Sequence, residues 1–213
     1  MITEVSTTQK AVAITFDDGP NPIYTPEVLE IFEKAEGKAT FFMIGEQMKE
    51  QPGIVKLVAE QGHEIGNHTY SHPKLSALTP AECLAEIESN EQMIRDLTGQ
   101  HPVVFRPPYL DYNHDTISIV ERKGYSMIGA LNLEAQDWEQ PGVEHILSAS
   151  RKSVKNGSIL IFHDGYGDRS QTIQAVKKLV FELKSEGYQL LTVSELLNLK
   201  EKNSDSKKRA KIY

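Results

Sequence analysis

Short apolar segments alternate with longer amphipathic segments along almost the whole chain of 213 residues. Strands separated by helices predict βαβ units and therefore a parallel sheet. Either a small barrel or an open doubly wound sheet satisfies this alternation. Seven segments resemble β-strands, namely 10–16, 38–44, 63–69, 102–108, 125–131, 158–163 and 188–193, and helical patterns begin near Thr25, Glu46, Thr79, Asp115, Val143 and Gln171.

Two of the predicted helices have clear boundary signals. Each begins with Thr-Pro, at 25–26 and 79–80, where the threonine is expected to cap the helix and the proline to occupy its first turn. Each ends at a glycine, Gly37 or Gly99. The strand segment 158–163 (SILIFH) is apolar on both faces, which is typical of a parallel strand covered by helices on both sides.

Composition restricts the classes of function that the chain can have. Thirty acidic and 23 basic residues give a formal charge of -7, which argues against a nucleic-acid-binding surface. The single cysteine, Cys83, excludes an intramolecular disulfide and a thiolate metal cluster. No apolar run is long enough to cross a membrane. The oligomeric state is left open.

The sequence predicts one domain over residues 1–199, because no linker or repeat divides the chain. Residues 200–213 are rich in lysine and arginine and are expected to form a disordered tail. If an export signal has been removed from the N-terminus, the protein acts outside the cell or facing the cell wall; otherwise it is cytoplasmic.

Polar residues with catalytic potential occur where the apolar strand segments stop. In parallel α/β folds, sites collect at the carboxyl ends of strands. Five predicted strand ends carry such residues: Asp17 and Asp18 in TFDDGP, His68 and His72 in NHTYSHP, Arg106 and Tyr109 in FRPPY, Asp137 and Trp138 in EAQDW, and His163 and Asp164 in ILIFHDG. We therefore expect these side chains to share one site.

The two histidines of HTYSH, His68 and His72, are four residues apart and reach one face if the segment makes a helical turn. With one carboxylate from another strand they form a two-histidine, one-acid metal site that leaves positions open for water. Taken alone, the histidine spacing is also compatible with two ordinary surface residues. The adjacent acids Asp17 and Asp18 supply the missing carboxylate and strengthen the metal hypothesis.

A division of labour explains why two acids are adjacent at the end of the first strand. One of them can bind a metal ion while the other removes a proton from water that the ion has activated. Arg106 is suited to hold the base carboxylate in its charged form. His163 is suited to protonate the departing nitrogen, because an amide nitrogen leaves poorly as an anion.

The motifs TFDDGP, NHTYSHP, FRPPY, EAQDW and ILIFHDG, in this order, resemble the five motifs of the polysaccharide deacetylases, the NodB-homology domain of carbohydrate esterase family four. The resemblance extends from about Val12 to Leu197. It implies an α/β fold, a distorted (β/α) barrel with about seven parallel strands. It also implies metal-dependent hydrolysis of acetyl groups, usually N-acetyl and alternatively O-acetyl, on a glycan such as peptidoglycan or a chitooligosaccharide.

Carried over by position, the resemblance implies a role for each motif residue. Water is the nucleophile, and one divalent ion, zinc or alternatively cobalt or nickel, is the cofactor. The implied roles are Asp17 as base, Asp18, His68 and His72 as metal ligands, Arg106 as the residue that orients Asp17, the Tyr109 backbone N–H as oxyanion donor, Asp137 as the residue that orients His163, His163 as acid, and Pro108, Trp138 and Ile161 as substrate-binding residues.

Three positions depart from the family pattern: Leu110 stands where a glycine is common, Leu131 where a tryptophan is common, and Glu134 where an aspartate is common. They affect the shape of the substrate site, so the choice among chitin, peptidoglycan and xylan stays open. Two other functions also stay open, namely a metal amidohydrolase of the same fold acting on a small non-sugar amide, and a carbohydrate-binding module without catalysis.

Overall fold

A computed structural model describes residues 1–200, so the predicted tail lies outside the described residues except for Lys200. All seven predicted strands are present, and their ladders are parallel. They are β1 (Ala11–Asp17), β2 (Thr40–Met43), β3 (Glu64–Asn67), β4 (Val104–Phe105), β5 (Ser126–Met127), β6 (Ile159–His163) and β7 (Gln189–Leu191). The apolar segment predicted for β6 is buried along its length except at its last residue.

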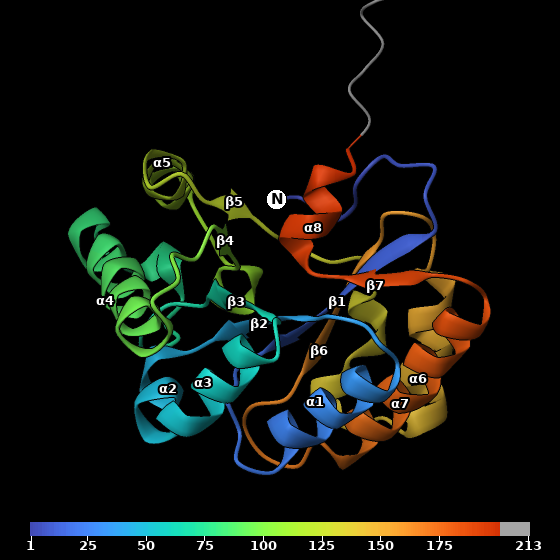
Figure 1. Ribbon diagram of the computed structural model, residues 1–213. Helices are drawn as coiled ribbons and strands as arrows, with labels where there is room; N and C mark the ends of the chain where they lie inside the picture. The colour runs from blue at the N-terminus through green and yellow to red at the C-terminus, as the bar shows by residue number, and fades with distance from the viewer. Residues whose placement is uncertain (201–213) are drawn as a thin grey trace, which may run out of the picture.

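The strands form one curved sheet in the order β5-β4-β3-β2-β1-β6, and β7 pairs with the first half of β1 (Figure 1). The N-terminal residues close the gap between the two ends of this sheet. Ile2 forms a parallel bridge with Ile128 after β5, and the Ile159 N–H of β6 donates to the Thr3 carbonyl oxygen. The predicted distorted (β/α) barrel is therefore confirmed as a half-barrel of parallel strands.

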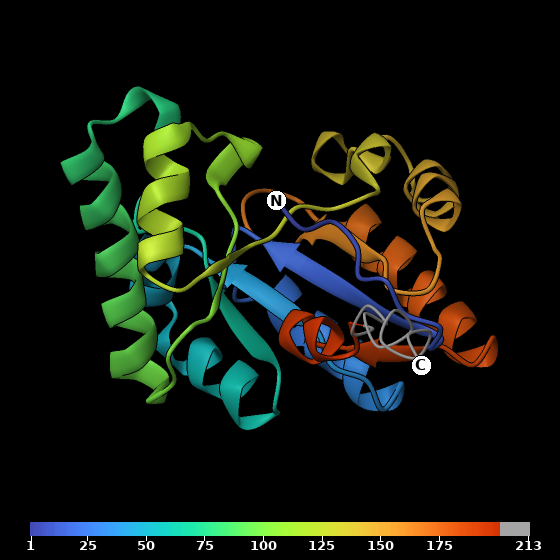
Figure 2. The same ribbon diagram turned by 90° about the horizontal axis from the view of Figure 1, so that it is seen from above.

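Eight α-helices occur in the described residues, and α1 to α7 surround the sheet, whereas α8 packs against its inner face through Val193 and Leu196. In Figure 2, α4 and α5 lie on one side of the central strands and α6 and α7 on the other. The helices are α1 (Tyr24–Lys34), α2 (Gly45–Glu50), α3 (Pro52–Glu60), α4 (Pro80–Thr98), α5 (His114–Arg122), α6 (Val143–Lys152), α7 (Ser170–Ser185) and α8 (Val193–Asn198). None of them is both long and apolar enough to span a membrane.

The structure differs from the predicted helices at two places. The pattern beginning near Glu46 contains two helices, α2 and α3, because Pro52 has no N–H with which to continue the first one. Helix α8 was not among the predicted segments, since its six residues are too few to establish a helical period.

The predicted cap is confirmed for α4 and wrong for α1. Thr79 caps α4 in a capping box with Glu82, and Gly99 ends that helix at a φ of 72°. Helix α1 instead begins at Tyr24, without a side-chain cap. The Thr25 hydroxyl has a different partner, because it donates to the Asp164 carboxylate on a distant loop.

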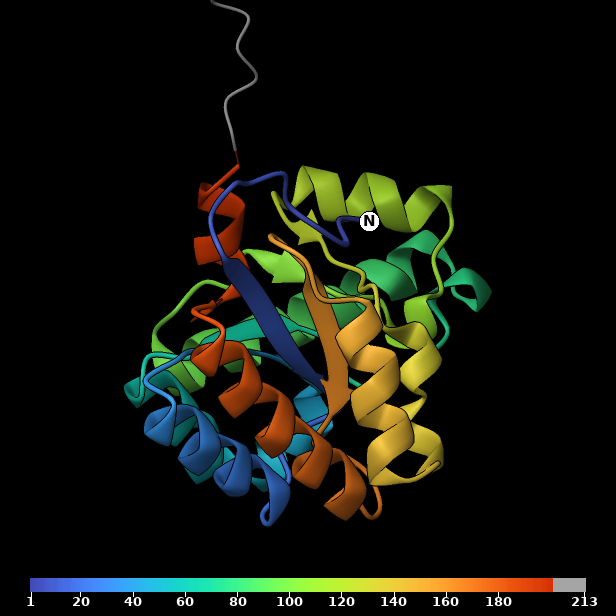
Figure 3. The same ribbon diagram turned by 90° about the vertical axis from the view of Figure 1, so that its right-hand side faces the viewer.

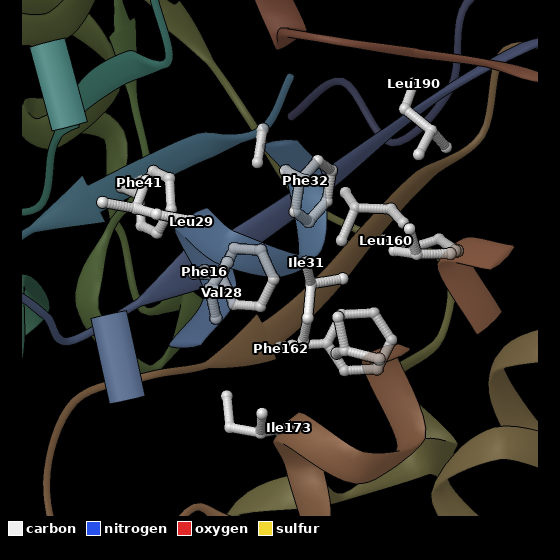
Figure 4. Close-up of a cluster of buried hydrophobic side chains, with 14 of the residues drawn as sticks. Phe16, Val28, Leu29, Ile31, Phe32, Phe41, Leu160, Phe162, Ile173 and Leu190 are labelled. Carbon is white, nitrogen blue, oxygen red and sulfur yellow. The ribbon is translucent and has the colours of Figure 1, made fainter. Parts of the chain in front are cut away.

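The main hydrophobic core lies between the sheet and helices α1, α3, α6 and α7. Figure 3 shows β1 and β6 side by side with their arrowheads at the same end, and helices α1, α6 and α7 lie across them. Phe16 of β1 stacks on Phe41 of β2 at 5.3 Å between ring centroids, and Phe32 of α1 meets Phe16 edge to face (Figure 4). Such packing fixes β1, whose last residues enter the functional site.

His63, which belongs to none of the sequence motifs, is buried in this core between the rings of Phe32 and Phe41. Its Nδ1 atom accepts a hydrogen bond from the Ala39 N–H at 3.0 Å, so the imidazole is held in its neutral form. Burial, followed by the charge of Lys38, lowers the pKa of His63 to about 4 from its ordinary value of 6.5.

This pKa makes the fold sensitive to acid. The unfolded chain binds a proton at His63 below pH 6.5 and the folded chain only below about pH 4, so acidification favours unfolding across this window. The full effect is about 3 kcal/mol. We expect His63→Asn to flatten the dependence of the unfolding free energy on pH between 7.5 and 4.5, measured by urea titration. The exposed His101→Asn variant is the control; an equal flattening there would contradict the assignment.

Candidate active site

The carboxyl ends of the parallel strands surround a cavity of about 410 Å³. Asp17 ends β1 and His163 ends β6, and these residues are register partners in neighbouring strands. Eleven residues line the cavity: Asp17, Asp18, His68, His72, Pro107, Tyr109, Leu110, Leu133, Trp138, Ile161 and His163. The strand ends thus bring the acids and histidines of separate motifs into one site, as the sequence predicts.

Several residues of the site have left-handed backbone conformations although none of them is glycine. The φ angles are 72° at Asp18, 65° at Thr69, 61° at His72 and 58° at Tyr109. A non-glycine residue in this region costs about 1 kcal/mol or more, and a β-branched residue such as Thr69 is rarely found there. Such strain persists where the surrounding structure enforces it, which is common at functional sites.

The left-handed conformation of Asp18 separates the two adjacent acids. Strand β1 ends at Asp17, and the chain turns at Asp18, so both carboxylates enter the cavity. The two histidines converge differently from the helical turn that we considered: Thr69 and His72 both have positive φ, and residues 68–72 form an irregular turn.

Asp18, His68 and His72 form a cluster in which one potential ligand atom from each lies within 4.8 Å of the others. Asp18 Oδ1 is 3.1 Å from His72 Nε2 and 3.4 Å from His68 Nε2. Burial opposes the charge of Asp18, but the two histidines outweigh it and hold the pKa of this carboxyl well below its usual range. Within residues 1–200, Asp18 Oδ1 is buried and has no hydrogen-bond donor in proper geometry.

The tautomer of His68 is fixed by its other ring nitrogen. His68 Nδ1 lies 2.7 Å from the Arg106 carbonyl oxygen, which can only accept, so Nδ1 carries the proton. In the neutral imidazole, Nε2 is then the nitrogen with the lone pair, and it is the one that faces Asp18. Two imidazole nitrogens and one buried carboxylate oxygen without a hydrogen-bond partner are a donor set that suits a divalent transition metal.

Arg106 is fully buried and orients Asp17. Its Nη1 atom donates to Asp17 Oδ1 at 2.6 Å and to the Thr15 hydroxyl at 2.7 Å, and its Nη2 atom donates to the Gly129 carbonyl oxygen at 3.0 Å. The guanidinium also lies 4.2 Å from the centre of the Phe42 ring. The guanidinium therefore fixes the Asp17 carboxylate in place and sets a positive charge beside it.

His163, at the end of the neighbouring strand, has an equivalent partner in Asp137. Its Nδ1 atom lies 2.9 Å from Asp137 Oδ1, and its backbone N–H donates to Asp137 Oδ2 at 2.8 Å. The Thr172 hydroxyl donates to the same Oδ2 at 3.1 Å. Burial opposes the charge of His163, but the carboxylates of Asp137, Asp17 and Asp18 raise its pKa to about 9.

The predicted substrate-binding residues occupy different places. Trp138 and Ile161 line the cavity, Trp138 at 40% exposure and Ile161 almost fully buried. Pro107 contributes to the lining, whereas its neighbour Pro108 is buried and lies outside it. Tyr109, at 64% exposure, places its ring against His72 with 4.6 Å between centroids.

Sequence reasoning missed residues that support the site or shape it. Thr15 and Thr172 bond to Arg106 and Asp137, yet a threonine within an apolar strand or a helix has no distinguishing pattern. Leu110 and Leu133 line the cavity. The departure of Leu110 from the family pattern is a sequence signal that this position differs at the site. Leu133 has no such signal in the sequence.

The family model described as polysaccharide deacetylase matches residues 4–128, which include three of the five motifs. The chain belongs to the polysaccharide deacetylase family. It is 40% identical over 198 residues to a peptidoglycan-N-acetylglucosamine deacetylase of Bacillus cereus, and the alignment covers 92% of each chain. It is 33% identical to a chitooligosaccharide deacetylase of a Bradyrhizobium strain, with 88% of this chain and 90% of the relative covered.

The solved structures of this family share the fold. A family four pseudoenzyme from Bacillus anthracis superposes with a TM-score of 0.85 at 28% identity, covering 93% of this chain and 69% of the other. The resemblance stated from the five motifs is therefore confirmed, and the chain is a polysaccharide deacetylase, a hydrolase of acetylated glycans.

The geometry of the polysaccharide deacetylase site predicts different effects for the two adjacent acids on metal binding. We expect the wild-type protein to bind one equivalent of zinc, and Asp18→Asn or His68→Ala to weaken binding by at least about 100-fold. Asp17→Asn retains the cluster and should stay within about tenfold of the wild type. Metal content by mass spectrometry after dialysis, with chelator competition for the affinity, decides this. An equal loss of zinc affinity in all three variants would contradict the assignment of Asp18, and not Asp17, as the metal ligand.

Proposed function

We propose that this polysaccharide deacetylase removes N-acetyl groups from a glycan containing N-acetylglucosamine, in a reaction that depends on one divalent ion, most suitably zinc. The observation that carries the proposal is that Asp17 and His163, at the ends of neighbouring strands, line one cavity together with the Asp18, His68 and His72 cluster. Amide hydrolysis requires a base for the attacking water and an acid for the departing nitrogen, both within reach of one acetyl group.

Asp17 serves as the base in this proposal. Its Oδ1 is engaged by Arg106, which leaves the other oxygen for the proton of the attacking water. The ion pair prevents the Asp17 side chain from rotating out of the cavity. A divalent ion held by Asp18, His68 and His72 would supply Lewis acidity toward the acetyl carbonyl and increase the acidity of water.

His163 serves as the acid. Its Nδ1 proton is directed at Asp137, so the remaining nitrogen is the one that can transfer a proton to the departing sugar amine. A pKa of about 9 keeps the imidazole protonated at neutral pH. The proton must reach the nitrogen before the carbon–nitrogen bond breaks, since an amine leaves as a neutral group.

The remaining residues of the cavity position the acetyl group. Ile161, Trp138 and Leu133 provide an apolar surface for the acetyl methyl group. The backbone N–H of Tyr109 is the proposed donor to the oxyanion of the tetrahedral intermediate. The strained conformation of Tyr109 holds its backbone at the rim of the cavity.

Peptidoglycan and chitooligosaccharides are the proposed substrate classes, because the relatives that cover most of this chain bear names that specify these glycans. A small non-sugar amide is the second candidate, since the fold and the catalytic groups do not by themselves fix the substrate. Loss of activity, as in the Bacillus anthracis pseudoenzyme, is disfavoured because every proposed ligand, base and acid is present.

Mass spectrometry of acetyl loss tests the substrate class. We expect the zinc-loaded protein to release acetate from chitooligosaccharides or peptidoglycan fragments faster than from acetylated xylan. Asp17→Asn should lower kcat by about 10³-fold or more, because it removes the base. Asp115→Asn, at an exposed position on α5 away from the cavity, is the matched carboxylate-to-amide control. Turnover of small amides without turnover of any glycan would contradict the proposal in favour of the second candidate.

The pH dependence of kcat tests the role of His163. An acid must be protonated, so the rate should fall as the pH rises through the pKa of His163. Asp137→Asn removes the carboxylate that contributes most to raising this pKa, and we expect the alkaline limb of the profile to move to lower pH. Thr172→Val, which loses one hydrogen bond but no charge, should move it much less. An alkaline limb unchanged in Asp137→Asn would exclude His163 as the acid.

A further inference from the structure

Asp164 follows the proposed acid in sequence, yet its side chain does not line the cavity. It is completely buried beneath the loop that follows β1. The Thr25 hydroxyl donates to Asp164 Oδ2 at 2.5 Å and accepts from the Asn21 N–H at 2.8 Å. Asn21 in turn accepts from the Ile23 N–H, so one chain of hydrogen bonds extends from Asp164 through residues 21–25.

The backbone beside Asp164 contacts the same loop. The N–H groups of Asp164 and Gly165 both lie 3.3 Å from the Asp17 carbonyl oxygen. A Cβ atom on Gly19 would lie 2.6 Å from Asp164 Oδ1, and one on Gly165 would lie 2.0 Å from the Asp18 carbonyl oxygen. The loop carrying the two acids therefore lies directly against the segment that follows His163, with no room for a side chain at either glycine.

We propose that Asp164 is a positioning residue whose carboxyl group, through Thr25, fixes the loop of Asp17 and Asp18 against the segment that carries His163. The effect on turnover rests on the proposed function, but the effect on the geometry of the metal cluster does not. Arg106 aligns Asp17 from β4, and Asp137 aligns His163 from its own loop. Asp164 differs from both because it connects two segments: the loop that carries Asp17 and Asp18, and the segment that carries His163.

The hydrogen-bond acceptor, rather than a negative charge, is the property of Asp164 that this role requires. Within residues 1–200, its Oδ1 atom has no hydrogen-bond partner and no cation forms an ion pair with the carboxyl group. Burial, followed by the charge of Asp18, raises the pKa of Asp164 to about 7. An amide side chain of the same shape, as in Asp164→Asn, keeps an acceptor for Thr25.

The test compares variants that remove the acceptor with one that retains it. We expect Asp164→Ala and Thr25→Val to lower kcat by about 10²-fold with KM within threefold, since displacements of about 1 Å cost this much in rate. Asp164→Asn should stay within about fivefold of the wild-type kcat. The double variant Thr25→Val/Asp164→Ala should be no worse than Asp164→Ala, because both changes break one connection.

A second readout does not depend on turnover. Residues that orient a metal site change its affinity by about 10- to 100-fold when they are removed, so Asp164→Ala should weaken zinc binding by about tenfold in chelator competition, and Asp164→Asn by less than threefold. If the wild-type protein deacetylates no glycan, the proposed function fails while this measurement still decides the role of Asp164. Thermal unfolding of each variant verifies that it is folded under the assay conditions.

Thr40→Val is the matched control, because Thr40 is another buried threonine that donates to a carboxylate, Glu64, and accepts from a backbone N–H, Val193. It lies at the opposite end of the strands and should leave kcat and zinc affinity unchanged. The inference is overturned if Asp164→Ala retains both wild-type values, if Asp164→Asn loses as much as Asp164→Ala, or if Thr40→Val matches Thr25→Val.

Discussion

The buried ion pair between Arg106 and Asp17 is the interaction on which the site depends. Both groups are removed from water, and each compensates the cost of burying the other. The pair also depends on the curvature of the sheet. Arg106 follows β4 and Asp17 ends β1, and two strands, β3 and β2, lie between them in the sheet. The guanidinium reaches Asp17 because the half-barrel brings the two strand ends to face each other across its interior. Losing either partner leaves a buried charge without compensation, which costs about 3–5 kcal/mol.

A second pair, Asp137 with His163, has the inverse arrangement. In one pair a buried cation fixes a carboxylate, and in the other a buried carboxylate raises the pKa of an imidazole. Each orienting group is itself held by a further hydrogen bond: Arg106 donates one to the Thr15 hydroxyl, and Asp137 accepts one from the Thr172 hydroxyl. Strain at Asp18, Thr69, His72 and Tyr109 accompanies this rigidity, and the packed strands beneath the cavity stabilise it.

Much of this architecture could be predicted from the sequence. Seven strand segments were located because apolar runs in a parallel sheet are continuous, and the Thr79 cap of α4 followed from local chemistry that is complete within four residues. The same local argument was wrong for Thr25. Its hydroxyl has a competing partner in Asp164, 139 positions along the chain, and no local pattern reveals such a contact. The irregular turn of residues 68–72 was also not predictable, because tertiary contacts enforce its positive φ angles.

By itself, the sequence determined the parallel α/β fold and the family, and with them the residue types available for chemistry at the strand ends. These follow from apolar periodicity and from motifs, each of which is contained in a short segment. Only the tertiary structure decided which atoms meet: that Arg106 crosses the barrel to Asp17, that His68 presents Nε2 to Asp18, and that Pro107 lines the cavity. The physical reason is that each of these features joins segments far apart in the chain or depends on a backbone turn, and both are fixed by packing of the whole domain.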